Sequence, residues 1–209
     1  MGVKQAKSRT TVEFTRISKG EISTEARLID QAKGDPKHFE ILYRRYHPDM
    51  FRYIYHKVRD EELAGDLTSQ VFVKALAKLK KYQHRGLPFS AWLYRIAINE
   101  VNQYFRKAKR TCYVTVEDAG LEGLQEAMED VGDQEAMLAA LRDVLTGMPD
   151  KDVTLIDLRF FEQRPFKEIG DVLGITEANA KAKTYRILKK MRERMEVYIQ
   201  HEQKIGNRP

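Results

Sequence analysis

The chain has 209 residues, of which 42% are hydrophobic and 33% are charged, and its net charge is +6. This is enough apolar material for a core, which argues against wholesale disorder. No run approaches the roughly eighteen apolar residues of a membrane span, and no apolar stretch of a secretory signal follows the basic N-terminus. The single cysteine, Cys112, excludes an internal disulfide and fits a location in the reducing cytoplasm.

The net charge is unevenly distributed along the chain. Residues 1–110 carry a net charge of +11, residues 111–141 carry eight acids and no Lys or Arg, and residues 142–209 carry a net charge of +3. Two basic regions are therefore separated by an acidic segment. Basic regions predict a polyanionic partner, although a solvated charged surface would explain the same asymmetry.

The N-terminal part of the chain predicts an arm followed by short helices. Residues 1–22 are polar and lack helical periodicity, which indicates a flexible basic arm without an assigned role. Helical spacing begins near Thr24, and Gly34-Asp35-Pro36 predicts the end of that helix. The next helix is expected to begin at Phe39 and to end at His47-Pro48, with another apolar face following it over residues 50–58.

Two longer helices follow. Between Glu61 and Lys80, apolar residues recur every four positions, and two others widen the stripe: Leu63, Leu67, Val71, Ala75 and Leu79, with Phe72 and Leu76. After a loop over residues 82–88, a second long helix is expected from Phe89 or Ser90 to the basic run at 106–110. The residues expected to pack it are Trp92, Leu93, Ile96, Ala97 and Val101.

The rest of the chain predicts an acidic linker and a second set of helices. Helical spacing resumes at Met137, and no stretch alternates convincingly enough to predict a sheet. We therefore expect an all-α protein with two small helical domains. They span residues 23–110 and 138–199, joined by a linker over residues 111–137 and followed by a tail over residues 200–209.

Residues 166–186 have the spacing of a helix-turn-helix motif. Gly174 is placed where a tight turn needs a positive φ, and the Thr176 hydroxyl can cap the second helix. Gly170 and Ala180 are small enough to let two helices cross closely. Such a motif places its second helix in the major groove of DNA.

The second helix of this motif would present polar and basic side chains outward: Glu177, Asn179, Lys181, Lys183 and Arg186. Those near its N-terminus are expected to contact base edges, and the basic ones are expected to contact phosphates. A plain helical hairpin with a solvated face remains the alternative.

A second candidate surface lies at the loop over residues 82–88 and on the helix after it. This loop carries basic and aromatic residues together, among them Tyr82 and Arg85, and the helix carries one polar stripe: Arg95, Asn99, Asn102 and Arg106. Arginines bind phosphates, amides can bond base edges, and aromatic rings can stack on unpaired bases. Phe89 and Trp92 are expected in the core, while Tyr82 fits either role.

Several segments resemble bacterial sigma factors of the sigma-70 family, and in particular its small two-domain extracytoplasmic-function (ECF) branch. The segments similar to region 2 are Leu42-Tyr43-Arg44-Arg45-Tyr46, Asp66-Leu67 through Val71-Phe72, and Trp92 through Asn99. Leu158-Arg159-Phe160-Phe161 and the helix-turn-helix motif resemble region 4. The likeness covers about residues 25–110 and 138–196, and the ordered set is specific to the family.

The resemblance implies binding to core RNA polymerase and recognition of a promoter. Region 4 would recognise the −35 element through Lys181, Tyr185 and Arg186, with Arg159 on a phosphate. Region 2 would hold a flipped base of the melted −10 element in a pocket containing Tyr82 and Asn99. The face that docks on the polymerase clamp helices would carry Asp66, Ser69, Gln70 and Lys74, although the family usually has Gln-Glu where this chain has Ser69-Gln70.

The resemblance also implies roles outside the two domains. The linker of this family enters the polymerase cleft, where the acidic segment could imitate nucleic acid, unless it is an ordinary linker. An inhibitory anti-sigma factor is a further expected partner.

Enzymatic activity finds no support in the sequence. The five histidines are scattered and form no ligand spacing with Cys112, and no glycine-rich loop is present to hold a phosphate, so neither a metal nor a cofactor is expected. The alternative functions are a stand-alone, dimeric helix-turn-helix regulator and a module that only titrates a partner.

Overall fold

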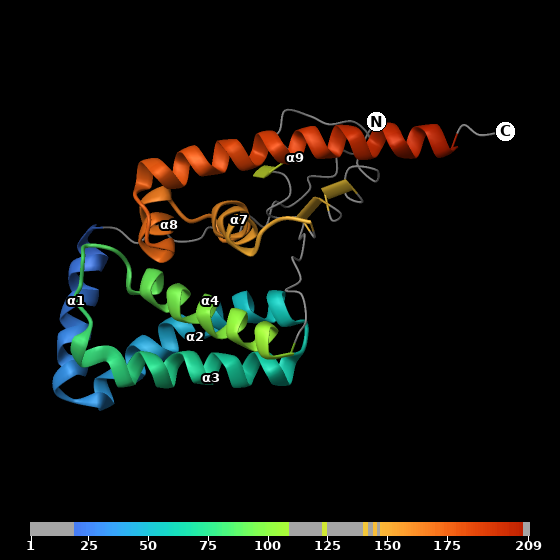
Figure 1. The fold of residues 1–209 in the computed structure, drawn as a ribbon. Coiled ribbons are helices and arrows are strands. Elements are labelled where there is room, and N and C mark those ends of the chain that lie inside the picture. The colour runs from blue at the N-terminus through green and yellow to red at the C-terminus, as the bar shows by residue number, and fades with distance from the viewer. Residues whose placement is uncertain (1–18, 109–122, 125–139, 142–143, 146, 207–209) are drawn as a thin grey trace, which may run out of the picture.

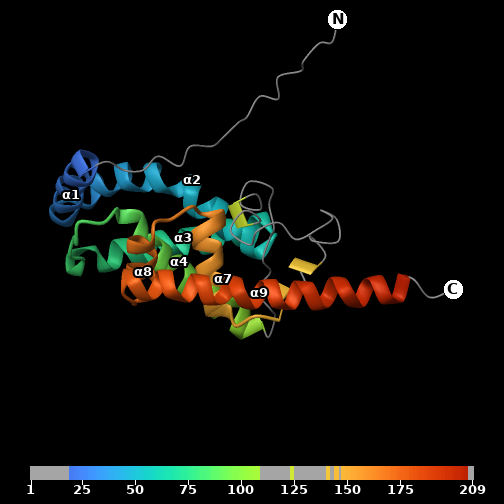
Figure 2. The same ribbon diagram turned by 90° about the horizontal axis from the view of Figure 1, so that it is seen from above.

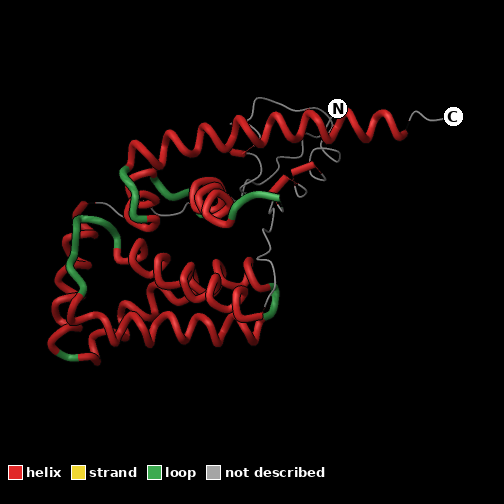
Figure 3. The backbone as a smooth tube through the Cα atoms, viewed as in Figure 1, coloured by secondary structure: helices red, strands yellow, loops and turns green. Residues whose placement is uncertain are grey.

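The computed structural model describes residues 19–108, 123–124, 140–141, 144–145 and 147–206. Within these residues the regular elements are all helical, which confirms the predicted all-α fold (Figures 1 and 3). Residues 1–18 of the expected arm, most of the acidic linker and Cys112 lie outside the described residues, whereas residues 19–22, expected in the arm, are helical. None of the described helices is long and apolar enough to cross a membrane.

Four helices form the N-terminal bundle: α1 (Lys19–Gly34), α2 (Phe39–Val58), α3 (Glu61–Lys78) and α4 (Phe89–Ala108). Short 3₁₀ helices at Pro36–His38 and Leu79–Lys81 follow α1 and α3. The first helix begins a few residues before the expected domain start, and it ends at Gly34 as the Gly-Asp-Pro sequence predicts. The core between the helices holds fully buried apolar residues: Ile29, Leu42, Ile54, Val71, Leu93 and Ala97.

Local chemistry sets the sharp corner between α2 and α3. Arg59 has a left-handed backbone with φ of 55°, and its N–H donates to the Tyr55 carbonyl at 2.8 Å. The next residue, Asp60, caps α3, because its side chain accepts a hydrogen bond from the Leu63 N–H at 3.0 Å.

The expected helix end at His47-Pro48 is wrong, because α2 continues through Pro48 to Val58. Proline inside a helix removes one backbone hydrogen bond and costs about 3 kcal/mol. Here the residues on both sides of it, including Tyr46, Met50 and Ile54, are buried in the bundle core. Their packing outweighs the local preference of proline, so one helix forms where two were expected.

The helical spacing of apolar residues also predicts the burial of one α3 side chain wrongly. Leu76 was expected to widen the buried stripe, but it is 40% exposed, while Phe72 and Ala75 beside it are buried. Leu76 comes four residues after Phe72 and therefore lies about 40° further round the helix, beyond the edge of the buried stripe.

The C-terminal group contains α7 (Asp150–Ile156), a π-helical turn η3 (Asp157–Phe161), α8 (Phe166–Leu173) and α9 (Glu177–Gly206). The last helix therefore includes residues 200–206, which were expected to form a tail. Its buried face holds Ala180, Ile187, Leu188, Met191 and Met195. Thr184 also lies on this face, and its hydroxyl donates to the Ala180 carbonyl at 2.9 Å, which satisfies the polar group inside the core.

The two groups of helices pack against one another, with α8 against α4 (Figures 1 and 2). A buried polar cluster lies at this contact. The Tyr94 hydroxyl of α4 donates to Glu162 Oε2 at 2.6 Å and accepts from Arg164 Nη2 at 3.0 Å. Burial raises the pKa of the Glu162 carboxyl, and the nearby Asp157 carboxylate raises it further.

Candidate nucleic-acid interface

The helix-turn-helix motif has the geometry that its sequence predicts. Gly174 ends α8 with φ of 68°, a conformation that favours glycine. The Ile175 N–H donates to the Gly170 carbonyl at 2.8 Å, and the Thr176 hydroxyl accepts from the Asn179 N–H at 3.2 Å. The turn therefore satisfies the backbone groups at the end of α8 and at the start of α9.

A Gly170→Ala substitution is expected to lower the free energy of unfolding by about 1–3 kcal/mol. A Cβ atom at this position would lie 2.7 Å from the Ile175 carbonyl oxygen and 3.2 Å from the Glu177 nitrogen, both of which belong to backbone. Urea unfolding would measure the loss. The matched control is Gly65→Ala in α3, where a Cβ meets nothing within 4 Å, and a gain of up to about 1 kcal/mol is expected. Equal effects at the two glycines would contradict this account of the turn.

The predicted side chains of the second helix do not all face the same way. Asn179, Lys181, Tyr185 and Arg186 are exposed, and Tyr185 is 61% exposed. Lys183 is half-buried instead and lines a pocket between α9 and α4. Asn179, Lys181, Tyr185 and Arg186 are thus all exposed within the first three turns of α9.

Arg159 lies in the π-helical turn and is held locally. Its Nη1 donates to the Arg164 carbonyl at 3.2 Å, and its guanidinium carbon lies 4.6 Å from the centre of the Phe166 ring. These contacts fix the side chain near the start of α8, where a guanidinium can reach a phosphate.

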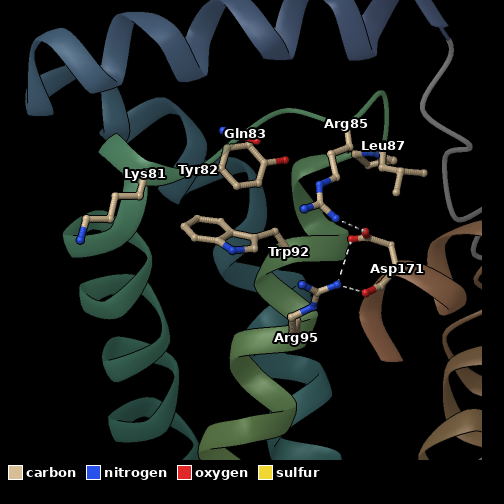
Figure 4. A pocket seen from close by; sticks show the side chains of 9 residues that line it. Lys81, Tyr82, Gln83, Arg85, Leu87, Trp92, Arg95 and Asp171 are labelled. Carbon is tan, nitrogen blue, oxygen red and sulfur yellow. Dashed lines mark hydrogen bonds and ion pairs between the residues drawn. The ribbon is translucent and has the colours of Figure 1, made fainter. Parts of the chain in front are cut away.

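The second candidate surface is a pocket at the loop between α3 and α4 (Figure 4). It has a volume of about 180 Å³, and Tyr82, Arg85, Trp92 and Arg95 are among its lining residues. The Tyr82 and Trp92 rings lie with centroids 4.6 Å apart. Burial, followed by the charge of Glu25, raises the pKa of Tyr82 to about 12.

The aromatic residues of the loop and of the first turn of α4 differ in how deeply they are buried. Phe89 is fully buried, as predicted, whereas Trp92, also expected in the core, is only half-buried. Tyr82 is half-buried as well, and both rings pack against the core. Tyr82 thus has one side against Phe89 and Trp92 and another side at the pocket.

The polar stripe along α4 continues from this pocket. Asn99 and Arg106 are exposed, and Asn102 and Arg95 are half-buried. Arg95, Asn99 and Asn102 line a second pocket of about 280 Å³, whose far side is formed by α7, α8 and α9.

Glu25 is a site residue that the sequence pattern misses. It is fully buried, and its Oε2 accepts from the Phe89 N–H at 2.6 Å, at the first residue of α4. Its other oxygen, Oε1, accepts from the Tyr46 hydroxyl. A carboxylate of α1 therefore caps α4 and fixes the end of the loop that carries Tyr82.

A Glu25→Ala variant is expected to lose about 2–4 kcal/mol of unfolding free energy, because two buried donors would lose their acceptor. The matched control is Asp30→Ala on the same helix, which removes an exposed ion pair with Lys33 and should change the free energy by less than about 0.5 kcal/mol. Urea unfolding of both variants tests this, and a loss at Glu25 no larger than at Asp30 would refute the capping role.

The predicted polymerase-facing side of α3 is partly engaged within the bundle. Asp66, Ser69 and Gln70 are exposed, but Lys74 forms an ion pair with the buried Glu100 of α4. Two apolar residues, Val73 and Leu76, are exposed beside them, at 66% and 40%. This side of α3 therefore offers a mixed polar and apolar surface, which is typical of protein interfaces.

No group of His, Cys, Asp and Glu that could hold a metal ion occurs among the residues that the structure describes.

Comparison with known proteins identifies both domains. Residues 42–111 match the family model of sigma-70 region 2, and residues 144–193 match that of sigma-70, region 4. The ECF RNA polymerase sigma factor BldN of Streptomyces coelicolor is 30% identical over 164 residues, which cover 78% of this chain and 62% of BldN. The ECF RNA polymerase sigma factor SigM of Bacillus subtilis is 26% identical over 152 residues, covering 72% of this chain and 91% of SigM.

A solved structure of CnrH in complex with the cytosolic domain of CnrY has a similar fold. It matches with a TM-score of 0.51 at 20% identity and covers 83% of this chain and 96% of that chain. The two family models match in the order of the family and together cover more than half of the chain. The chain therefore belongs to the sigma-70 family, as an RNA polymerase sigma factor of the ECF type.

Proposed function

We propose that this chain binds core RNA polymerase and directs it to promoters by contacting two DNA elements with its two domains. The observation that carries the proposal is that each family domain exposes polar and basic side chains, Asn99 and Arg106 on the first and Lys181 and Arg186 on the second. The chain itself would catalyse no reaction, because it supplies recognition while the polymerase supplies the chemistry.

The start of α9 would recognise the −35 element as duplex DNA. Lys181, Tyr185 and Arg186 are exposed on one surface and would enter the major groove together with Asn179. Arg159 and Lys183 would contact phosphates on either side, which fixes the register of the helix.

The loop pocket and α4 would capture the melted −10 strand. A flipped base would lie against Tyr82 and bond to the Asn99 amide, which offsets the cost of unstacking it. Arg85, Arg95 and Arg106 would hold the phosphates along the strand, and Asn102 adds a further amide that can contact a base.

The exposed side of α3 would dock on the polymerase clamp helices. Asp66, Ser69 and Gln70 supply polar contacts, and the neighbouring Val73 supplies apolar area. Lys74 would act through its ion pair with Glu100, which ties α3 to α4 beneath this surface.

An inhibitory anti-sigma factor and a cytoplasmic location complete the proposal. The complex of CnrH with the cytosolic domain of CnrY supports a protein partner for this fold.

The acidic linker at residues 111–137 would enter the polymerase cleft as a polyanion.

Promoter-directed transcription by the chain mixed with core polymerase tests this function. We expect transcripts only when both components are present, together with co-purification of the chain and the polymerase. A dimer that binds duplex promoter tightly by itself, and that does not co-purify with core polymerase, would instead establish a stand-alone regulator.

A further inference from the structure

The second pocket described above is lined by side chains of both family domains. One wall belongs to α4, with Ile98, Asn99 and Asn102, and the facing wall belongs to α7, α8 and α9. The volume of about 280 Å³ is close to the lower end of the range of about 300–1,000 Å³ that is typical of small-molecule sites. Such sites occur preferentially between domains, so this pocket has the size and the place of a site for a small ligand.

The charged lining of the pocket is cationic. Arg95 of α4, Lys151 of α7 and Lys183 of α9 each contribute one positive charge, and no acidic residue is among the described residues that line the pocket. Arg95 has a partner outside this lining, because its Nη2 lies 3.4 Å from Asp171 Oδ2. Lys151 and Lys183 form no ion pair with another residue in the described part of the chain. Two ammonium groups without such a partner beside one cavity favour an anionic ligand.

The apolar lining of the pocket is aliphatic. Ile98, Leu173 and Ile175 pack against the core but are only half-buried, so each keeps part of its surface uncovered. A ligand with an aliphatic body would remove this surface from water. Nucleobases are typically held by stacking on aromatic rings, and no aromatic residue is among the lining residues that the structure describes. The lining therefore favours an aliphatic ligand over a nucleotide.

Two amides add neutral hydrogen-bond donors to the lining. Asn99 and Asn102 are three residues apart, so their side chains lie on the same face of α4. Each amide group can donate to an oxygen of a carboxylate or a phosphate, as the ammonium groups of the lysines can. The lining thus supplies donors for an anionic head group as well as a wall for an aliphatic chain.

We propose that this pocket binds a small aliphatic anion with a carboxylate or phosphate head group. The head group binds to Lys151, Lys183 and the two amides, and the chain lies against the aliphatic wall. Asn99 and Asn102 also belong to the surface proposed to bind the −10 strand, so the anion competes with that strand. The binding site stands without the proposed function, and only the competition rests on it.

Calorimetric titration of the full chain with octanoate tests the site, because octanoate joins a carboxylate to an aliphatic chain. We expect one saturable site with a dissociation constant of roughly 0.1–1 mM, which ligand efficiency allows for about ten non-hydrogen atoms. Acetate has the head group alone, and octylammonium has the chain with the opposite charge. Both are expected to bind at least about tenfold more weakly. Octylammonium binding as tight as that of octanoate would overturn the proposal.

Octyl phosphate distinguishes the two possible head groups in the same titration. Tighter binding of octyl phosphate than of octanoate would support the site and identify its ligand as an aliphatic phosphate. Tighter binding of octanoate would support the site and identify an aliphatic carboxylate. Absence of saturable binding by both anions would overturn the proposal, since the cavity would then hold only water.

Charge removal tests whether the anion binds in this pocket. Lys151→Gln/Lys183→Gln is expected to weaken octanoate binding by about fivefold, as two partly exposed charged contacts allow. Lys167→Gln is the matched control, because this lysine of α8 is exposed and is not among the lining residues. Its removal should weaken binding by less than about twofold. Equal weakening by the double variant and the control would overturn the proposal.

Filling the cavity tests the aliphatic wall without a change of charge. Ile98→Phe would occupy part of the pocket from α4, and octanoate is expected to bind at least about fivefold more weakly. Thermal unfolding of the purified variant shows whether it is folded. A folded variant that binds octanoate as tightly as the unmodified protein would contradict the assignment of the chain to this wall.

Competition is measured with a labelled single strand that carries the −10 sequence of a promoter transcribed by the holoenzyme. At an octanoate concentration of about ten times its dissociation constant, the full chain should bind this strand about tenfold more weakly. Unchanged strand affinity in a protein that binds octanoate would refute the competition. Core-dependent transcription without saturable anion binding would overturn the site alone. Saturable anion binding without core-dependent transcription would support the site and refute the proposed function.

Discussion

Lys181→Ala is expected to lower transcription from promoters with an intact −35 element by about tenfold, since one good base contact is worth about 1–3 kcal/mol. The side chain is exposed near the start of α9, on the surface formed with Tyr185 and Arg186. Base substitutions within the −35 element should then have less effect on the variant than on the unmodified protein. Transcription by reconstituted holoenzyme from matched promoters measures both effects.

The matched control for this prediction is Lys189→Ala on the same helix. Lys189 lies about two turns after Lys181, carries the same charge and is exposed, and it forms an ion pair with Glu193. Its removal should weaken binding only slightly and should leave the response to −35 substitutions unchanged. Equal loss of −35 discrimination in both variants would show that charge alone, rather than the position of Lys181, determines the effect.

Asn99→Ala is expected to reduce transcription by about tenfold to a hundredfold, because the cost of flipping a base would no longer be offset by the amide. The loss should depend on the −10 element and should leave discrimination at the −35 element intact. Asn99 is exposed on α4, so its removal should not unfold the bundle. Thermal unfolding of the purified variant provides that check.

The control for Asn99 is Gln31→Ala, which removes an exposed amide from α1 of the same bundle. It should leave transcription unchanged.

Lys181→Ala and Asn99→Ala together test whether the two domains recognise separate promoter elements. Identical patterns of sensitivity to −35 and −10 substitutions in Lys181→Ala and Asn99→Ala would contradict the assignment of separate elements to the two domains.

The helix-turn-helix motif could be predicted in detail because its signals are local. Gly174 has the positive φ that its place in the turn requires, and Thr176 caps α9 through its hydroxyl. Gly170 approaches the backbone of the turn so closely that a Cβ has no room. Each of these features depends on residues within about ten positions of one another, which a single sequence displays directly.

Pro48 shows where local rules fail. Proline is a strong helix breaker by itself, but the sequence does not display the packing of the apolar residues around it against α3 and α4. In this helix long-range packing overrides the local preference of proline, and that outcome is visible only in the folded structure.

The contacts between the domains were beyond prediction for the same reason. Lys57 and Asp157 are one hundred positions apart in the chain, and Tyr94 and Glu162 are 68 apart. The same holds within the N-terminal bundle, where Glu25 and Phe89 are 64 apart. A charged residue that will be buried looks the same in the sequence as one that will be solvated, because its partner lies on a different helix. The sequence therefore predicts the residues of the −10 surface but not the domain that covers them.

Transcription by the reconstituted holoenzyme across a library of promoters with randomised −35 and −10 elements tests the central claim most directly. We predict that active promoters share two separate elements, that Lys181→Ala weakens selection at the first, and that Asn99→Ala weakens selection at the second. Activity that does not require core polymerase, or selection of a single palindromic element by both variants alike, would contradict the account.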